Sequence, residues 1–306
     1  MMISYIFLEV ILPILILMLL GLVIQKKYQF QLKQISKWLV YGFMPAAVFL
    51  NIYEVQIDIS LLSQLFLYLI LFTFVMIGIT YILGRLFHIK PKESAALKNS
   101  ISLMNSGNYG LPVSQIIFSS NPIGVSVQIF VLIFQNILTY TYGIYNLLSA
   151  SKTFIEIIRA FLKLPLIYAL LLGLFFQTLN LTMPTFLLVP IEYLANSFVA
   201  VALLLLGAQL ASIKLQYFHR VITLALVGRL LVGPVVALII ICFLQIDGVL
   251  AQSLLIASSF PTSRNTATLA LEYDVEPDLQ AQIVLYSTLL SSLTVTVVIY
   301  LAMQLF

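Results

Sequence analysis

Long apolar stretches follow one another along almost the whole chain, separated only by short polar segments. Most contain roughly 17–25 residues, the length that a helix needs to cross the hydrocarbon core of a bilayer. The pattern predicts an all-α polytopic membrane protein with one transmembrane domain, residues 1–306, and ten transmembrane helices. The predicted helices are residues 4–24, 34–51, 61–84, 95–120, 123–148, 164–180, 187–211, 221–243, 249–272 and 279–304.

Two of the predicted helices are interrupted by glycine, proline and polar residues. The interruption in 95–120 is Asn105-Ser106-Gly107-Asn108-Tyr109-Gly110-Leu111-Pro112, and the one in 249–272 is Phe260-Pro261-Thr262-Ser263-Arg264-Asn265. Lipid cannot satisfy unpaired backbone groups, so irregular backbone at membrane depth occurs where it lines a cavity or meets protein. Broken segments at matching places in two halves point to the binding site of a transporter. We therefore expect the two helices to cross at Pro112 and Pro261.

The ten helices divide into two halves of five, residues 1–150 and 151–306. An odd number of helices makes the second half enter the membrane from the opposite side, so the halves form an inverted repeat. The alternative is that 95–120 and 249–272 are only kinked, because proline and glycine are common in membrane helices. The first interruption favours a functional role, since it combines two glycines, two asparagines and one proline.

Composition and charge support this assignment: 62% of the residues are hydrophobic and 8% are charged, against roughly 25% charged in soluble domains. Basic residues flank alternate loops, which the positive-inside rule places in the cytoplasm. This predicts a multi-pass protein of the cytoplasmic membrane with both termini outside, and it accounts for the net charge of +4 without nucleic acid. The flanking basic residues are Lys26, Lys27, Lys33, Lys37, Arg85, Lys90, Lys92, Lys98, Lys152, Arg159, Lys163, Lys214 and Arg220.

Several motifs, in order along essentially the whole chain, resemble those of the auxin efflux carrier family. Asn105 stands seven residues before the proline of the Gly110-x-Pro112 pattern, and Asn265 follows Pro261 by four residues. Two further segments that resemble the family are Arg229-Leu-Leu-Val-Gly-Pro234 and Glu272-Tyr273-x-Val-x-Pro277-Asp278. The short loop after residue 148 is similar to that of bacterial members and differs from the long insert of the plant PIN auxin exporters.

The resemblance implies two inverted five-helix repeats, as in bile-acid and sodium/proton transporters, with the broken helices crossing beside the substrate. It also implies a scaffold of 4–24, 34–51, 164–180 and 187–211, against which the other helices move in an elevator mechanism. The implied substrates are organic anions: auxin in plants, malate or malonate in bacteria. The expected partners are a small carboxylate, the lipid bilayer and a second copy of the chain in a homodimer.

The residues of the two interruptions have the chemistry of an anion site. Half-helices that begin after Pro112 and Pro261 would direct unpaired N–H groups and positive dipole ends toward the bilayer middle. Amide and hydroxyl side chains add donors for a carboxylate, although bonding between helices is an alternative role for each asparagine. The predicted substrate-binding residues are Asn105, Ser106, Gly107, Asn108, Gly110, Pro112, Pro261, Thr262, Ser263, Arg264 and Asn265. The polar residues Gln128, Gln135 and Asn136 could also face this site, but structural packing fits them better.

Arg264 needs a partner, because a cation in the first turn of a half-helix is opposed by the helix dipole. A central membrane arginine costs about 2.5–3.5 kcal/mol even on insertion scales. One hypothesis is that a substrate carboxylate pairs with its guanidinium. The other is a structural ion pair with Glu9 or Glu192, or a side chain that extends to the cytoplasmic side. For Arg229 we expect a side chain that extends to the cytoplasmic interface.

These observations predict a secondary transporter for small mono- or dicarboxylates that needs no metal and no cofactor. An enzyme is not predicted, because the chain lacks a His-Glu-x-x-His pair, paired membrane aspartates and a nucleotide-binding loop. A sodium- or proton-coupled exchanger should carry acidic residues at the crossing, and both interruptions lack them. The remaining alternatives are a bile-acid-type symporter, a channel and a transporter-like sensor.

Overall fold

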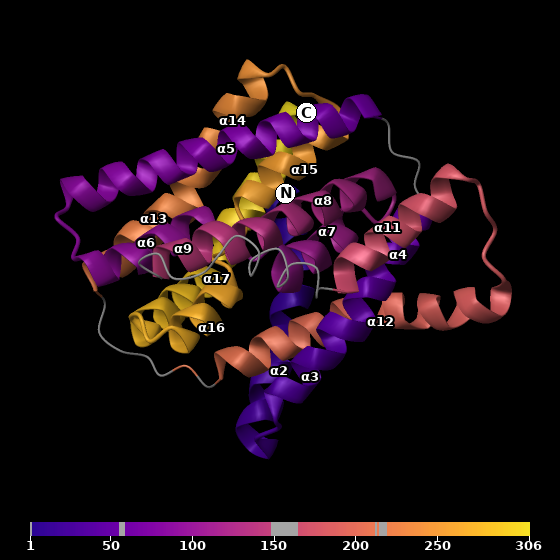
Figure 1. Ribbon diagram of the computed structural model, residues 1–306, viewed down its shortest axis with the longest axis horizontal. Helices are drawn as coiled ribbons and strands as arrows, with labels where there is room; N and C mark the ends of the chain where they lie inside the picture. Colours follow the sequence, from indigo (N-terminus) through magenta and orange to yellow (C-terminus); the bar gives the residue numbers. More distant parts are fainter. Residues whose placement is uncertain (1, 55–58, 148–164, 212, 214–218) are drawn as a thin grey trace.

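The computed structural model describes residues 2–54, 59–147, 165–211, 213 and 219–306, and over these ranges the chain forms helices and one isolated β-bridge (Figure 1). A helix satisfies its backbone hydrogen bonds within one segment, which is why apolar sequences in lipid adopt it. The all-helical prediction is confirmed. The predicted boundary between residues 150 and 151 lies outside the described residues, as do Lys152, Arg159, Lys163 and Lys214.

The first half of the chain contains α-helices and single π-helical turns (η). They are α1 (Met2–Ile6), η1 (Phe7–Ile11), α2 (Leu12–Tyr28), α3 (Leu32–Trp38), η2 (Leu39–Phe43), α4 (Met44–Glu54), α5 (Ile59–Leu86), α6 (Pro91–Ser102), η3 (Ser106–Gly110), α7 (Leu111–Ile117), α8 (Pro122–Leu138), η4 (Thr139–Gly143) and α9 (Ile144–Leu147). The second half contains α11 (Pro165–Thr178), α12 (Thr185–Leu210), α13 (Arg220–Val227), η5 (Gly228–Val232), α14 (Gly233–Phe243), α15 (Gly248–Ser258), α16 (Arg264–Glu272) and α17 (Pro277–Leu305).

By length and composition, seven helical segments in the described ranges can cross a membrane. These are Ile3–Tyr28, Leu32–Glu54, Leu61–Leu86, Pro122–Leu147, Thr185–Leu210, Arg220–Phe243 and Pro277–Leu305. The predicted helix 164–180 appears as the shorter apolar helix α11. The predicted helices 95–120 and 249–272 are each divided, into α6 and α7 and into α15 and α16.

Prolines explain most of the π-helical turns. A proline ring excludes the carbonyl four residues earlier and offers no N–H, and a wider turn with bonds from i to i+5 accommodates both defects. Four of the five described π turns end two residues before a proline, namely Pro13, Pro45, Pro112 and Pro234. These bends keep the segments continuous, unlike the breaks after α6 and α15.

The helices pack in two groups. In one group α12 packs on α2 and α4, and α4 packs on α11. In the other group α15 packs on α8, α14 and α17, while α5 packs on α6 and α14. Figure 1 shows the first group toward the right and bottom and the second toward the left and top.

Within the first group, α2 and α12 touch backbone to backbone. A Cβ added to Gly21 would lie 2.0 Å from the carbonyl oxygen of Leu204. A Cβ added to Gly207 would lie 1.8 Å from the carbonyl oxygen of Met18. Only glycine fits at these two positions, as at other close contacts between membrane helices.

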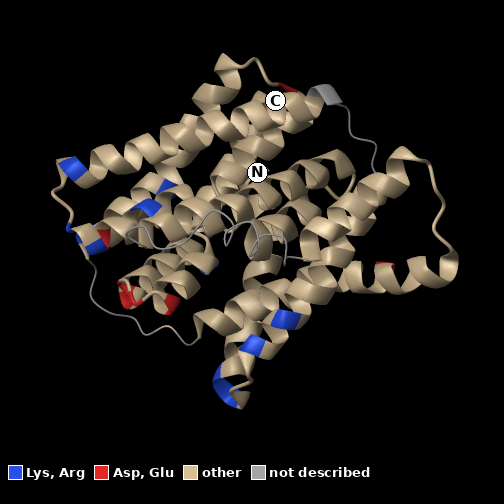
Figure 2. Cartoon of the chain, viewed as in Figure 1, with Lys and Arg blue, Asp and Glu red and all other residues tan. Residues whose placement is uncertain are grey.

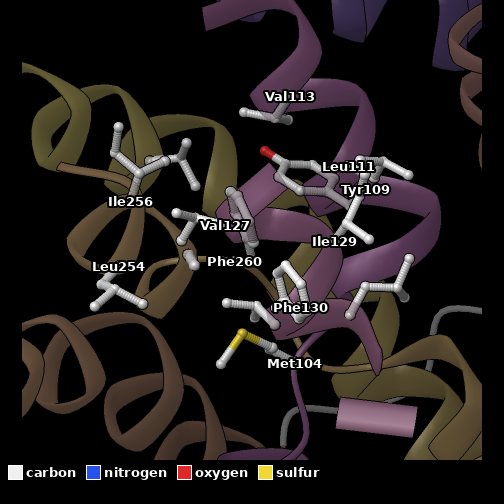
Figure 3. Close-up of a cluster of buried hydrophobic side chains, with 14 of the residues drawn as sticks. Met104, Tyr109, Leu111, Val113, Val127, Ile129, Phe130, Leu254, Ile256 and Phe260 are labelled. Carbon is white, nitrogen blue, oxygen red and sulfur yellow. The ribbon is translucent and has the colours of Figure 1, made fainter. Parts of the chain in front are cut away.

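An apolar cluster packs around the two interruptions. Figure 3 shows side chains of α8 and α15 gathered about Tyr109 and Phe260. The rings of these two aromatic residues meet edge to face, with centroids 5.8 Å apart. Both side chains are buried. Protein rather than lipid therefore surrounds the irregular backbone on this side, as a break at membrane depth requires.

Candidate functional site

The two interrupted segments cross through their main chains. α6 ends at Ser102 and η3 begins at Ser106, while α15 ends at Ser258 and α16 begins at Arg264. Between these ends, Met104 and Thr262 form an antiparallel bridge. The Asn105 N–H donates to the Pro261 carbonyl at 2.8 Å, and the Ser263 N–H donates to the Leu103 carbonyl at 2.8 Å. Each break thus satisfies backbone groups of the other, which lipid could not do.

The crossing lies at Pro261, as the sequence predicts, but not at Pro112. The residue opposite Thr262 is Met104, and Pro112 lies in the first turn of α7. The expectation for Pro112 was wrong because Pro112 lies inside the continuous helical segment formed by η3 and α7, where the π-helical turn accommodates its missing N–H. The non-helical residues of this interruption, Leu103 to Asn105, lie before that segment.

Polar side chains around the crossing hold its backbone in place. The Thr262 hydroxyl donates to the Ser100 carbonyl at 2.9 Å. The Gln128 amide donates to the Ser106 carbonyl at 2.9 Å, and the Gln135 side chain accepts from the Met104 N–H at 3.2 Å. The structural role expected for the two glutamines is therefore present.

Arg229 meets the carbonyl ends of both divided helices. Its guanidinium donates to the Ile101 carbonyl at 2.9 Å and to the Ser258 carbonyl, and its exposed fraction is 0%. The expectation that Arg229 extends to the interface was wrong. Two carbonyls at helix ends accept from its two terminal nitrogens inside the protein, while its buried Nε has no partner in the described ranges.

The helices that begin after the two breaks, η3 and α16, have no side-chain cap at their N-terminal ends. Neither Asn105 before η3 nor Ser263 before α16 donates or accepts a capping hydrogen bond through its side chain. The first N–H groups of a helix have no partner within it and carry its positive dipole end. The Ser106 N–H bonds to the Met104 carbonyl and the Thr266 N–H to the Ser263 carbonyl, so the remaining first-turn N–H groups are the ones available to an anion.

A cavity of about 100 Å³ lies at this crossing. Seven of the eleven predicted site residues line it: Asn105, Ser106, Gly107, Asn108, Ser263, Arg264 and Asn265. The other four support the backbone. Pro261 and Thr262 bond at the bridge, Pro112 is the second residue of α7, and a Cβ on Gly110 would lie 2.6 Å from the Phe260 ring.

Other segments complete the cavity with residues that sequence reasoning missed. They come from the predicted helix 34–51, from η4 and from the start of α11. These residues are Ser36, Val40, Met44, Thr139, Tyr140, Pro165 and Leu166. Gln135 and Asn136 line it as well. No motif marks the missed residues, because ordinary side chains become lining only through packing.

Arg264 lies where two cavities meet. It lines the crossing cavity and also a larger cavity of about 690 Å³ against α12 and α17. Neither Glu9 nor Glu192 pairs with it, since the only ion pair in the described ranges joins Lys90 and Glu93. Its charge is therefore left without a carboxylate partner in that part of the chain.

One further donor has no partner. The side-chain Nδ2 of Asn105 is buried and bonds to nothing in the described ranges. A buried amide left unpaired costs about 1–3 kcal/mol, so a ligand acceptor at this position would relieve a real penalty.

Within the described residues, no group of three or more His, Cys, Asp or Glu could hold a metal ion.

Comparison with known proteins gives matches over nearly the whole chain. A family model described as a membrane transport protein matches residues 6–157 and 149–299. An uncharacterized transporter of Methanocaldococcus jannaschii is 27% identical over 303 residues, which cover 94% of this chain and 96% of that protein. An uncharacterized transporter of Methanothermobacter thermautotrophicus is 26% identical over 290 residues, which cover 92% of this chain and 94% of that protein.

Proposed function

The chain belongs to the auxin efflux carrier family of membrane transport proteins, and we propose that it is a secondary transporter for small organic anions such as malate or malonate. The carboxylate binds in the crossing cavity. Asn105, Asn108 and Asn265 donate through their amides, and the amide ends of η3 and α16 add backbone donors. Arg264 supplies a positive charge, which pairs with the second carboxylate of a dicarboxylate.

The observation that carries this proposal is that Arg264 forms no ion pair within the described ranges of the chain. A guanidinium, two uncapped helix starts and the residue Asn105, whose buried amide is unpaired, all lie at one cavity. All of these groups are donors or positive. A carboxylate supplies the acceptors and the negative charge that all of them lack.

The size of the cavity favours a small substrate. Sites for drug-sized ligands usually measure roughly 300–1,000 Å³, whereas the crossing cavity measures about 100 Å³. The larger cavity of about 690 Å³ shares Arg264 with it. We propose that the larger cavity is the approach to the crossing and that the crossing itself selects a short mono- or dicarboxylate.

We also propose ten transmembrane segments in two inverted repeats, placed in the cytoplasmic membrane with both termini outside. The seven long apolar helices, α11 and the two divided helices supply the ten segments. Charge supports the orientation: Figure 2 shows Lys and Arg at the α2–α3 and α5–α6 turns, and the α11–α12 and α14–α15 turns contain neither. Basic turns stay in the cytoplasm.

This orientation predicts which turns a membrane-impermeant maleimide reaches in intact cells. In a Cys242→Ser background, we expect the Asn180→Cys variant to be labelled at the α11–α12 turn. The Gln29→Cys variant, at the α2–α3 turn, should be labelled only after permeabilisation. Both positions are exposed. The reverse pattern would show that the chain is inserted the other way round.

Alternating access requires the site to face each side in turn. The grouping of helices supports an elevator mechanism, in which the group with the crossing moves against the group of α2, α4, α11 and α12. Several cavity residues, Ser36, Val40 and Met44 among them, belong to α3, η2 and α4, so the cavity lies between the two groups.

Uptake into proteoliposomes tests the proposed function. We expect saturable uptake of radiolabelled malonate or malate that an excess of unlabelled substrate inside the vesicles accelerates by exchange. A channel would show neither saturation nor acceleration. A dianion moving inward works against about 2.3 kcal/mol per charge per 100 mV, so the first assay uses vesicles without a membrane potential. No uptake of any small mono- or dicarboxylate would reject the proposal.

The two crossing asparagines should contribute to affinity. Asn105→Ala and Asn265→Ala should each weaken carboxylate binding roughly ten- to a hundredfold, because a hydrogen bond to a charged group contributes about 1.5–3 kcal/mol. Binding is measured by calorimetry on purified protein. Asn121→Ala, in the turn before α8, is the control and should bind normally. Normal affinity in both crossing variants would leave these residues with packing roles only.

A further inference from the structure

Arg229 occupies a site made from the ends of two helices rather than from acidic side chains. It lies in η5, and its two guanidinium bonds reach Ile101 and Ser258. Ile101 is the penultimate residue of α6, and Ser258 is the last residue of α15. One side chain thus joins both divided helices at the ends where their carbonyls have no partners within the helix.

The charges at this place balance without a carboxylate. Each helix C-terminus carries about half a negative elementary charge, so two of them equal about one. Arg229 supplies one positive charge, and it has no ion pair, since the described ranges contain only the pair Lys90–Glu93. Gly233 packs against the guanidinium, because a Cβ there would lie 3.3 Å from its Nη2.

Carbonyl ends of broken helices are the places where transporters coordinate a coupling cation. We propose that Arg229 is a built-in counter-cation that fills this place, so that the crossing binds no sodium ion. Arg229 neutralises the carbonyl side of the crossing. The amide side of the crossing, with Arg264, then keeps a positive charge, and the anion balances it. Arg229 is a positioning residue that does not touch the substrate.

The first test measures the unfolding temperature of the purified full-length protein. Arg229→Gly should lower it by about 5–10 °C, as expected when a buried charge partner is removed. Millimolar guanidinium chloride should restore most of this loss by entering the vacated space. Urea has the same planar shape without the charge and should not restore it. Arg220→Gly, which removes an exposed arginine from the start of α13, should change little and should not respond to guanidinium.

Equal restoration by urea, or no restoration by guanidinium, would overturn the proposal. If the glycine variant cannot be purified, Arg229→Lys and Arg229→Gln take its place. The lysine variant keeps the charge and should be the more stable of the two. A glutamine variant as stable as the lysine variant would show that charge is not what the site needs.

The second test uses the unaltered protein. Its unfolding temperature should be the same in sodium chloride and in choline chloride, and a rise in sodium would overturn the proposal. The consequence for transport rests on the proposed function: carboxylate uptake should proceed equally in the two salts. Sodium-stimulated uptake would reject the built-in cation while leaving carboxylate transport intact. Guanidinium rescue without any uptake would reject the transport function and leave the role of Arg229 standing.

Discussion

Replacing Gly207 with leucine is expected to remove most of the folded protein from the membrane. Even the Cβ of alanine would lie 1.8 Å from the Met18 carbonyl oxygen, and both helix backbones would have to separate. Overpacking a core usually costs about 1–3 kcal/mol. Here the obstacle is backbone, which cannot change rotamer, so we expect Gly207→Ala at the upper end of that range and Gly207→Leu beyond it.

The yield of monodisperse protein after detergent extraction measures this effect. Gly78 in α5 is the matched control, since a Cβ there meets nothing within 4 Å. Gly78→Ala and Gly78→Leu should give normal yields. A normal yield of Gly207→Leu would mean that α2 and α12 do not pack as closely as described.

Arg264→Gln is expected to weaken dicarboxylate binding about ten- to a hundredfold while changing the affinity of the matching monoacid little. This difference arises if Arg264 binds the second carboxylate, because each charge-assisted hydrogen bond contributes about 1.5–3 kcal/mol. Arg264→Lys keeps the charge but loses the planar two-point contact. We therefore expect its dicarboxylate affinity to fall between those of the wild type and the glutamine variant.

Calorimetric titration of malonate and acetate into each purified variant measures the two affinities. Arg220→Gln, an exposed position, controls for loss of positive charge. Asp278, which lines the larger cavity together with Arg264, provides the competing explanation. Equal losses for both ligands, restored by adding Asp278→Asn, would show that Arg264 serves a structural pair and not the substrate.

Much of the crossing could be predicted from local chemistry. Glycine, proline and asparagine in an apolar helix indicate backbone that leaves the helix, whatever surrounds it, and this located both interruptions. The position of the crossing could not be predicted in the same way. Met104 carries no turn signal, and it became the bridge residue because Asn105 and Leu103 bond to a segment more than 150 residues away.

The position of the Arg229 side chain also could not be predicted from the sequence alone. A lone arginine in an apolar helix has two options, reaching the interface or finding partners inside, and hydropathy alone does not separate them. The partners that decide it are carbonyl groups, which every residue has and no sequence pattern marks. Only the approach of α6 and α15 to η5 brings the Ile101 and Ser258 carbonyls to the guanidinium.

The sequence by itself determined that this is an all-helical membrane protein with two interrupted helices. The length of an apolar run, the missing amide hydrogen of proline and the missing side chain of glycine are all local properties. The tertiary structure alone decided where the interruptions cross, which cation neutralises which helix end, and which ordinary side chains line the cavity. These depend on the distance between segments far apart in the chain, and hydrogen bonds and charges act only over a few ångströms.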